Sequence, residues 1–552
     1  MCSICQSFQP WMDECAFAVP EDGGGGGMQN TLPVFTNDQI ATQLTAGFWS
    51  SYGGPRSFDA AAGDTLYVDI TGLTAEGQSM ARQALASWTE VSGLNFAEIN
   101  ASTPPTNTQT ETADAAGSTS TSYDMTIGEE FLGTLGTGAD RDAVAVNLTN
   151  GQVISITLDA DNRNGNATAD PFLRVYDASG TLIAQNDDAS GRNSALTFQA
   201  NGAGTYYIEA GSFGDSNPGD YRLTVRPGGA ADIVFDDEQA GAYATSTISG
   251  GTIQSSFVNI NSNWVGGSDR TDGYFFQTYL HEIGHALGLG HAGNYNGGAT
   301  YGTDNHYAND SWQASVMSYF HQSENTWLDA SFAYVITPMM ADVIAIQNLY
   351  GTPDANTGDT VYGEGGTTGS YLDTAIDLSN PVAYTVFDTG GTDTFDFSSQ
   401  TAHQRLDLRE ETYSDLAGLD GNIGISRGTV IENGFTGDGN DTVTGNHVGN
   451  LLSAGFGTDT VRAGQGHDAL RGGSGNDDLS GEAGADLIEG GTGNDTMDGG
   501  DGGDLIVGDD VTLAMLTMLF PDWTPPPEAQ ELLDDGDYLV LWDDILGDTG
   551  LI

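Results

Sequence analysis

The stretch "AGQGHDALRGGSGNDDLSGEAGADLIE" (463–489) consists of three successive copies of one nine-residue unit, and the same register continues without an insertion from 436 to 507. In each copy glycines permit tight turns, the apolar eighth residue fills a core, and the sixth residue is usually aspartate. Aspartates that recur at one height on successive coils can share a hard cation. The array therefore predicts a parallel β-roll over 436–510 that binds several calcium ions.

The second copy of the repeat departs from this pattern. Asn450 stands where the aspartate is expected and Val448 where a glycine is expected, which argues against calcium at this copy. An unstructured Gly/Asp-rich tract is the alternative, but the strict period and the apolar eighth residue argue against it. Without calcium, we expect the array to be unfolded by its own charge. The predicted calcium ligands are Asp441, Asp459, Asp468, Asp477, Asp486, Asp495 and Asp504.

Charge and composition exclude several classes of partner. The 552 residues carry 77 acidic and 14 basic side chains, a formal net charge of -63. Such a chain repels nucleic acids and anionic membranes, and hard cations are its natural counterpart. An acidic, salt-tolerant surface is the alternative explanation for most carboxylates outside the repeat. No apolar run reaches the roughly 18 residues of a membrane span, so we expect no stable membrane insertion.

The segment "HEIGHALGLGH" (281–291) places three histidines in a fixed spacing. Apolar periodicity predicts a helix that ends near Gly288, on which His281 and His285 project from one face and can reach one ion. The glycine permits a left-handed turn that ends the helix and returns the chain, so that His291 supplies a third imidazole. The pattern therefore indicates a single metal site built from three histidines.

Glu282 is expected to act as a base and not as a ligand. It follows His281 directly, so on a helix of 3.6 residues per turn it is rotated by roughly 100° from that ligand. Three neutral imidazoles leave one position of a tetrahedral ion open for water, as in catalytic zinc sites. Surface or core histidines without a metal are the alternative, but they do not account for five specified residues in one register. The sequence therefore predicts one catalytic zinc ion.

Downstream, "SVMSY" (315–319) supplies a methionine and a tyrosine after the zinc motif. With these two signals the sequence resembles the metzincin metalloproteases, and within them the serralysins. The resemblance implies that Met317 forms a hydrophobic floor beneath the zinc, and that Tyr319 can ligate zinc and swing to stabilise the transition state. "PMMADVIAIQNLYG" (338–351) resembles the closing helix of the same family, and the nonapeptide array matches the repeats-in-toxin family.

The resemblance implies a zinc endopeptidase that hydrolyses peptide bonds of extracellular proteins. Glu282 would take a proton from water and return it to the leaving amine, while zinc and Tyr319 hold the developing oxyanion. The protein or peptide substrate would lie extended along a sheet edge, and a plain edge strand is the alternative. By resemblance to serralysins, that edge is formed by Gly241, Ala242, Tyr243 and Ala244. We expect a monomer.

The chain is predicted to be multidomain, with an α/β (α+β) metzincin catalytic domain interrupted by an inserted all-β sandwich and followed by the parallel β-roll. Residues 64–100 show the pattern of a strand, a helix and a strand, and 231–238 that of a strand continuing the same sheet. A Thr/Ser/Pro-rich linker and regularly spaced short strands lie between them. The predicted parts are a cysteine-containing, pro-like segment with a glycine linker (1–27), the first part of the catalytic domain (28–100), a linker (101–122), the inserted sandwich (123–228), the zinc-binding part (229–355), a linker and β-rich entry to the roll (356–435), the roll (436–510) and a tail (511–552).

The insert contains "DPFLRVYDASGTLIAQNDD" (170–188) and "GTYYIEAG" (204–211), which resemble the bacterial pre-peptidase C-terminal domain. We expect a non-catalytic binding or stabilising role for it. Three alternatives stay open: the insert binds substrate or carbohydrate, it carries calcium on Asp170, Asp187 or Asp188, or it acts only as a spacer.

The two ends of the chain suggest how it is exported and regulated. The N-terminus has neither the basic region nor the apolar run of a signal peptide. Resemblance to serralysins implies type I secretion from a Gram-negative bacterium, with the secretion machinery reading a signal in 511–552, and hence an extracellular protein. Cys2, Cys5 and Cys15 are the only cysteines. One hypothesis places a thiolate at the open zinc position before activation, and a cluster unrelated to the active site is the alternative.

A second class of function is also compatible with the pattern. The chain would then be a secreted calcium-binding adhesin or matrix protein whose protease domain is inert. The intact glutamate and tyrosine of the predicted active site favour the peptidase.

Overall fold

The computed structural model describes residues 32–99, 107–117, 119–161, 165, 167–168, 170–187, 193–228, 231–508 and 525–526. The predicted cysteine segment, the start of the predicted linker and nearly all of the tail lie outside these residues. Contacts divide the chain into two compact units, of which Met1–Asp64, Thr74–Asn95 and Asp237–Ile552 form the first and Thr65–Leu73 and Phe96–Asp236 the second. None of the helices in the described part of the chain combines the length and the apolar character that a membrane span requires.

The helices of the first unit begin and end where local signals place them. The Thr36 hydroxyl caps the first helix in a capping box with Gln39, and the longest helix starts after Thr74 and ends at Gly93 with φ +69°. The buried Trp88 on that helix donates its indole N–H to the Leu280 carbonyl at 3.1 Å, which ties it to the zinc-motif helix. The helices are α1 (Asn37–Thr42), α2 (Ala75–Ser92), α3 (Tyr274–Ala286) and α4 (Met340–Tyr350), with shorter turns η1 (Gln43–Gly47), η2 (Phe48–Ser51), η4 (Trp264–Gly266), η5 (Gln322–Glu324) and η6 (Tyr371–Asp377).

A five-stranded sheet has the order β14-β15-β13-β1-β2. Its strands are β1 (Thr65–Gly72), β2 (Asn95–Glu98), β13 (Ile233–Asp236), β14 (Ala242–Ser249) and β15 (Thr252–Ile260). The predicted order of strand, helix and strand is present in β1, α2 and β2. β13 pairs in parallel with β1, and Val68 lies opposite Ile233, so the sheet resumes after the insert as predicted. β14 pairs antiparallel with β15 and lies at the edge of the sheet.

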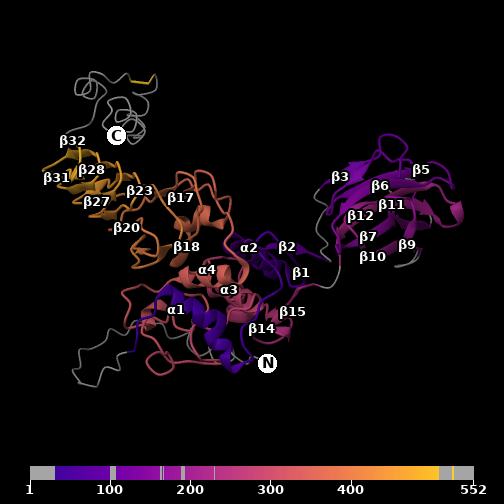
Figure 1. Cartoon of the computed structure of the whole chain (residues 1–552), viewed down its shortest axis with the longest axis horizontal. Coiled ribbons are helices and arrows are strands. Elements are labelled where there is room, and N and C mark those ends of the chain that lie inside the picture. Colours follow the sequence, from indigo (N-terminus) through magenta and orange to yellow (C-terminus); the bar gives the residue numbers. More distant parts are fainter. Residues whose placement is uncertain are drawn as a thin grey trace. The chain divides into compact units, whose positions relative to one another are not determined.

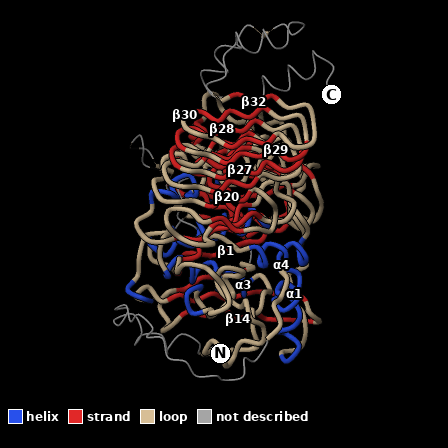
Figure 2. The backbone as a smooth tube through the Cα atoms, turned by 90° about the vertical axis from the view of Figure 1, so that its left-hand side faces the viewer, coloured by secondary structure: helices blue, strands red, loops and turns tan. Residues whose placement is uncertain are grey.

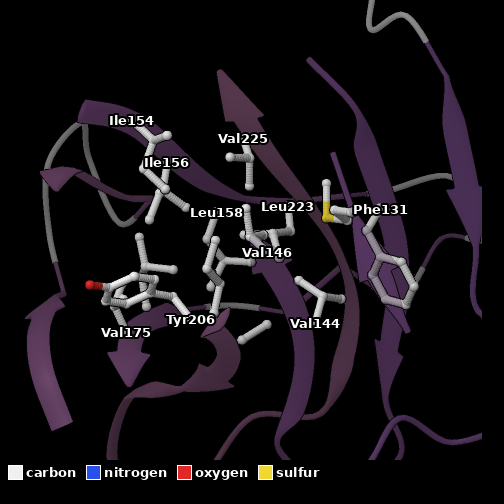
Figure 3. Packing of buried hydrophobic residues seen from close by; sticks show 14 of the residues in the cluster. Phe131, Val144, Val146, Ile154, Ile156, Leu158, Val175, Tyr206, Leu223 and Val225 are labelled. Carbon is white, nitrogen blue, oxygen red and sulfur yellow. The ribbon is translucent and has the colours of Figure 1, made fainter. Parts of the chain in front are cut away.

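The second unit contains two packed five-stranded sheets with the orders β10-β7-β12-β5-β3 and β4-β6-β11-β8-β9. Buried and half-buried residues alternate along β8, as expected for a strand with one face in a core. Side chains such as Val146, Leu158 and Leu223 fill the space between the sheets (Figure 3). The strands are β3 (Thr108–Thr110), β4 (Asp124–Met125), β5 (Glu130–Leu135), β6 (Asp142–Leu148), β7 (Val153–Ala160), β8 (Pro171–Tyr176), β9 (Leu182–Asn186), β10 (Ser194–Gln199), β11 (Gly204–Ser212) and β12 (Gly219–Pro227), with the turn η3 (Phe213–Asp215) (Figure 1).

The range 101–122, which we expected to be a linker, contributes β3 to this sandwich. Thr108 pairs with Glu130 on β5, and Thr224 on β12 pairs with the same residue from the other side. Backbone pairing requires no apolar side chain, so a polar composition concealed this strand. The two ends of the sandwich therefore lie two strand spacings apart, about 10 Å.

The repeat array winds into a parallel β-roll of 18 residues per coil. Thr442 lies opposite Thr460, Thr460 opposite Asp478, and Asp478 opposite Thr496, so each coil comprises two nonapeptides (Figure 2). Glycine is required where coils touch: a Cβ at Gly473, with φ +102°, would lie 2.1 Å from a carbonyl oxygen of the preceding coil. The two sheets of the roll have the orders β17-β19-β23-β25-β28-β30-β32 and β20-β24-β27-β29-β31, and β26 (Phe456–Gly457) pairs with β28.

The roll sheet begins well before the first nonapeptide. β17, β19, β20 and β23 belong to the two roll sheets, so 356–435, predicted as a linker and β-rich entry to the roll, already contributes strands to the stack. A further sheet has the order β16-β18-β22-β21. The strands are β16 (Tyr334–Val335), β17 (Val361–Gly363), β18 (Val382–Val386), β19 (Thr394–Asp396), β20 (Arg405–Asp407), β21 (Tyr413–Ser414), β22 (Ile423–Ile425), β23 (Asn433–Phe435), β24 (Thr442–Thr444), β25 (Leu451–Ser453), β27 (Thr460–Gln465), β28 (Ala469–Gly475), β29 (Asp478–Ala483), β30 (Leu487–Thr492), β31 (Thr496–Asp498) and β32 (Leu505–Val507).

Candidate metal centre

Helix α3 carries the first two histidines of the predicted zinc site. His281 and His285 lie one turn apart, with ring centroids separated by 4.7 Å. A backbone carbonyl holds each ring from behind: Nδ1 of His281 lies 2.8 Å from the Val316 oxygen, and Nδ1 of His285 lies 2.8 Å from the Leu289 oxygen. These contacts leave both Nε2 atoms for a ligand.

A glycine turn brings in the third histidine. Gly288 has φ +110°, and a Cβ at this position would lie 2.3 Å from the Arg56 carbonyl oxygen. The indole N–H of Trp49 donates to the Gly288 oxygen at 2.7 Å, so a segment near the start of the first unit holds the turn. The chain then reverses, and Nδ1 of His291 lies 3.0 Å from the Tyr295 oxygen. Only glycine fits this conformation and this close approach.

The three Nδ1 contacts determine the tautomer of each ring. Carbonyl oxygens only accept hydrogen bonds, so each Nδ1 carries the proton and each Nε2 presents a lone pair. The candidate ligand atoms lie within 4.8 Å of one another, and the Nε2 atoms of His285 and His291 are 3.0 Å apart. Burial lowers the pKa of His281 to about 4 and that of His285 to about 3, and holds the pKa of His291 well below its usual range. Neutral imidazoles with converging lone pairs fit a zinc ion.

The Glu282 carboxylate is buried beside these ligands. Burial raises its pKa to about 8, and a hydrogen bond with the Ala244 backbone partly opposes the shift. Its Oε2 atom accepts no hydrogen bond from the described part of the chain. A carboxyl group with a pKa near neutrality is suited to take up and release a proton at pH 7. Ala244 lies on β14, the edge strand that includes the predicted substrate-binding residues Ala242 and Tyr243 and follows Gly241.

Met317 and Tyr319 lie in the turn that follows the zinc motif. Met317 is fully buried, and a Cβ at Gly284 would lie 2.7 Å from its sulfur, so the methionine packs against α3 between the first two histidines. The ring centroid of Tyr319 lies 4.5 Å from that of His291 and 6.2 Å from that of His281. The structure thus brings together all six residues predicted for the zinc site.

Two buried aspartates that the sequence analysis did not identify hold this turn. Asp342 on α4 accepts hydrogen bonds from the Ser315 hydroxyl at 2.6 Å and from the Val316 N–H at 2.7 Å. Asp310 accepts one from the Ser318 hydroxyl at 2.7 Å. A lone acid in the apolar run "PMMADVIAI" was a usable signal for Asp342, because a buried carboxylate needs donors. Asp310 lies in a polar loop, where no sequence signal marks it.

The predicted calcium ligands form two ladders with a spacing of 18 residues. One carboxylate oxygen binds the backbone of the preceding coil: the Asp468 N–H donates to Asp486 Oδ1 at 2.9 Å, and the Asp459 N–H to Asp477 Oδ1 at 2.9 Å. Asp495 accepts in the same way from Asp477, Asp504 from Asp486, and Asp441 from Gln404. The other oxygen is buried and accepts no hydrogen bond from the described residues in Asp441, Asp459, Asp468, Asp477 and Asp486.

Burial of these carboxylates disfavours their negative charge in the absence of a cation. Burial raises the pKa of Asp459 to about 7, that of Asp468 to about 8 and that of Asp486 to about 6. Carboxylate oxygens that are buried and lack donors fit a bound hard cation, because the cation replaces the lost hydration.

In the second copy of the repeat, which lacks the aspartate, the polar side chains are hydrogen-bonded within the protein. Asn450 Oδ1 accepts from the Asn446 N–H at 2.8 Å, and its Nδ2 donates to the Glu432 carbonyl at 3.0 Å. The Asn446 amide in turn donates to the Ile431 carbonyl at 2.8 Å. Asn450 and Asn446 are thus hydrogen-bonded within the protein at the copy where the sequence makes calcium doubtful.

In the sandwich, the structure gathers a different set of acids from the predicted one. Asp188 lies outside the described residues, and neither Asp170 nor Asp187 belongs to a group of three metal-ligating side chains within the described part of the chain. The carboxylates that lie within 4.8 Å of one another are those of Glu111, Asp114 and Asp142. Two of the three come from the range expected to be a linker, which explains why they were missed.

Asp142 is the buried member of this group. Its side chain is 1% exposed, and neither oxygen accepts a hydrogen bond of normal geometry from the described residues, although the Tyr221 hydroxyl favours its charged form. Burial, followed by repulsion from Glu111, raises the pKa of Asp142 to about 8. This carboxylate set fits a hard cation.

Comparisons with known proteins match two parts of the chain to families. Residues 352–506 match the family described as Peptidase M10 serralysin C terminal, and residues 140–212 match the bacterial pre-peptidase C-terminal domain. Among solved structures, the pre-peptidase C-terminal domain of a collagenase from Bacillus anthracis is 20% identical over 19% of this chain and 93% of that one, with a TM-score of 0.16, too low to support a statement about fold.

Curated proteins also match. Serralysin C of Dickeya chrysanthemi is 44% identical over 37% of this chain and 42% of its own length. Metalloprotease AprA of Pseudomonas entomophila is 39% identical over 47% of this chain and 53% of its own length. Serralysin of Photorhabdus luminescens is 40% identical over 40% of this chain and 46% of its own length. The chain thus spans about half the length of the curated relatives it matches. Together the matches show that the chain is related to the serralysin-type metalloproteases and carries a pre-peptidase C-terminal domain segment.

Proposed function

We propose that the chain is a zinc-dependent endopeptidase that hydrolyses peptide bonds of extracellular proteins. The observation that carries this proposal is the convergence of three neutral imidazoles, each fixed by a backbone carbonyl, beside the buried carboxylate of Glu282. A site built only for structure would close the metal with a fourth protein ligand. The relationship to metalloproteases supports the same conclusion.

His281, His285 and His291 would hold the zinc ion, which supplies Lewis acidity toward the scissile carbonyl and toward water when it is bound. The Glu282 carboxylate would accept a proton from the attacking water and release it to the leaving amine, and its burial, which raises its pKa, makes it a stronger base. The Tyr319 hydroxyl would donate a hydrogen bond to the oxygen that gains negative charge in the transition state.

The substrate would add an extended strand to β14. This strand lies at the sheet edge, and its Ala244 backbone contacts the Glu282 carboxylate, so a peptide paired along it passes beside the proposed base. The roll would bind several calcium ions and depend on them for folding, which the unpartnered aspartate oxygens support. We also propose that the protein is secreted by the type I route, which the resemblance to serralysins supports, and that it is a monomer.

Casein zymography with the full-length protein tests this proposal. Wild type should clear the substrate, a zinc chelator should abolish clearing, and Glu282→Gln should lower activity by at least 100-fold while zinc still binds. Glu364→Gln removes an exposed acid from the same unit and is the matched control, expected to retain activity. Equal clearing by wild type and Glu282→Gln would contradict the proposal, and no clearing by either would favour the inert adhesin or matrix protein.

A further inference from the structure

Asp310 joins two segments of the metal site that are separated in sequence. The side chain is fully buried. Its carboxylate accepts a hydrogen bond from the Ser318 hydroxyl at 2.7 Å and lies 3.1 and 3.2 Å from the Tyr295 hydroxyl. Ser318 belongs to the turn that carries the methionine floor, and Tyr295 closes the loop of the third histidine. The two donors replace the hydration that this carboxylate loses on burial.

The Tyr295 and Ser318 hydroxyls, which Asp310 orients, also accept hydrogen bonds from backbone N–H groups at and after Tyr319. The Tyr295 hydroxyl accepts the Tyr319 N–H at 3.3 Å, and the Ser318 hydroxyl accepts the Phe320 N–H at 3.2 Å. Because each hydroxyl gives its proton to the carboxylate, each keeps a lone pair directed at an amide. The carboxylate therefore sets the direction of two hydrogen bonds that flank Tyr319.

Tyr295 also connects this network to a zinc ligand. Its carbonyl accepts from His291 Nδ1, and its ring centroid lies 4.7 Å from that of Tyr319. The ring of Tyr319 in turn lies 4.5 Å from His291. Tyr295 thus holds the histidine through its backbone carbonyl and contacts Tyr319 through its ring, and Asp310 anchors the hydroxyl at the end of that ring.

We propose that Asp310 is a positioning residue, which holds Tyr319 against His291 in the orientation that the reaction requires. The inference rests on the proposed function and assigns a role to a residue that touches neither metal nor substrate. Asp342 is the natural comparison, because it is equally buried and binds the same turn. It acts on Val316, whose carbonyl holds His281, so it should govern metal retention instead.

The experiment compares Asp310→Asn, Asp342→Asn, Tyr319→Phe and the double variant Asp310→Asn/Tyr319→Phe in the zinc-loaded full-length protein. With an internally quenched peptide, Asp310→Asn should lower kcat about 10- to 100-fold, somewhat less than loss of a direct transition-state donor, and change KM by less than threefold. The double variant should be no slower than Tyr319→Phe. Metal affinity, measured by competition with a chelator, should change less than threefold in Asp310→Asn and more than tenfold in Asp342→Asn.

Tyr295→Phe provides a second route to the same answer if Asp310→Asn does not fold, because it removes the hydroxyl and keeps the ring. It should reproduce the loss of kcat. Multiplicative losses in the double variant, or a loss of metal affinity by Asp310→Asn equal to that of Asp342→Asn, would overturn the proposal and leave a purely structural role.

A readout without catalysis separates this inference from the proposed function. In the Co²⁺-substituted protein, Tyr319→Phe should alter the visible absorption spectrum, and Asp310→Asn should shift it in the same direction. If wild type cleaves no peptide but Tyr319→Phe and Asp310→Asn shift the Co²⁺ spectrum in the same direction, the positioning role stands and the peptidase proposal fails. If Tyr319→Phe or Asp310→Asn leaves the spectrum of wild type unchanged, the positioning role fails.

Discussion

Replacing Asp468 by asparagine should stabilise the calcium-free roll. Asp468 is fully buried, and burial raises its pKa from 3.8 to about 8. Such a shift corresponds to roughly 5 kcal/mol of destabilisation at pH 8, where the group is about half charged in the folded coil, at 1.36 kcal/mol for each pH unit. Asparagine removes this charge and keeps the oxygen that accepts the Asn450 N–H.

The native chain already has asparagine in place of aspartate one coil earlier, at Asn450. There the amide of Asn450 donates to the carbonyl 18 residues before it, that of Glu432. The equivalent acceptor for a new amide at 468 is the Asn450 carbonyl, which accepts the Ala469 N–H at 2.8 Å. Allowing about 1 to 3 kcal/mol for an imperfectly satisfied amide, we expect a net gain of about 2 to 4 kcal/mol at pH 8.

The pH dependence has a defined sign. The folded coil binds the Asp468 proton more tightly than the unfolded chain does, so the stability of the calcium-free roll falls as pH rises from about 4 to about 8. Asp468→Asn removes the contribution of this residue to that slope. In saturating calcium the order should reverse, because the variant lacks one ligand.

Hydrogen exchange of peptides from 463–489 in chelator, corrected for intrinsic rates and followed from pH 5, where protonated aspartates favour the folded coil, to pH 8, measures this local stability. Asp501→Asn is the matched control, since it removes the same unit of charge from an exposed position of the roll. If wild type loses protection at no lower pH than Asp468→Asn as the pH rises from 5 to 8, or if Asp501→Asn shifts that loss equally, the reasoning is refuted.

Three further predictions concern other parts of the chain. Gly288→Ala introduces a Cβ 2.3 Å from a carbonyl oxygen at φ +110°, so zinc affinity in a chelator competition should fall more than tenfold, whereas alanine at the open Gly298 should leave it unchanged. Asn450→Asp replaces satisfied amide donors by a buried charge, so the calcium concentration that half-restores strand circular dichroism should rise; an unchanged midpoint would contradict the amide account. Asp142→Asn removes a carboxyl whose pKa burial raises to about 8, so the melting temperature of the sandwich in chelator should increase at pH 8 and much less at pH 5; a decrease at pH 8 would disprove it.

The parts that the sequence predicted are those encoded by local spacing. His281 and His285 share a helix face, and Gly288 reverses the chain within three residues of His291, so a short window contains the whole ligand set. The parallel roll likewise follows from the nine-residue period in the sequence, whereas the strand pairing was needed to show that two nonapeptides make one coil.

The parts that could not be predicted depend on partners that are distant in sequence. Asp310 and Asp342 become supports of the zinc site only because the turn at 315–319 lies between them in space. β3 and β17 pair through their backbones, in segments without the repeat or an apolar alternation. Burial of a polar residue and pairing of a polar strand are tertiary properties, and no window of sequence displays them.

The adjacency of the two ends of the sandwich has a consequence for the folding of the sheet that it interrupts. Val68 and Ile233 must meet across 165 residues of chain. Once Thr108 and Thr224 flank Glu130, only the segments 68–108 and 224–233 still separate Val68 from Ile233, and the effective loop shortens to about 50 residues. At about 0.6 kcal/mol for each halving, the prefolded insert lowers the entropy cost of closure by roughly 1 kcal/mol. Folding of the insert thus brings β1 and β13 closer together before they pair. A substitution in the sandwich core such as Leu223→Ala, which destabilises the insert, should therefore slow formation of the β1–β13 pair although it changes neither strand.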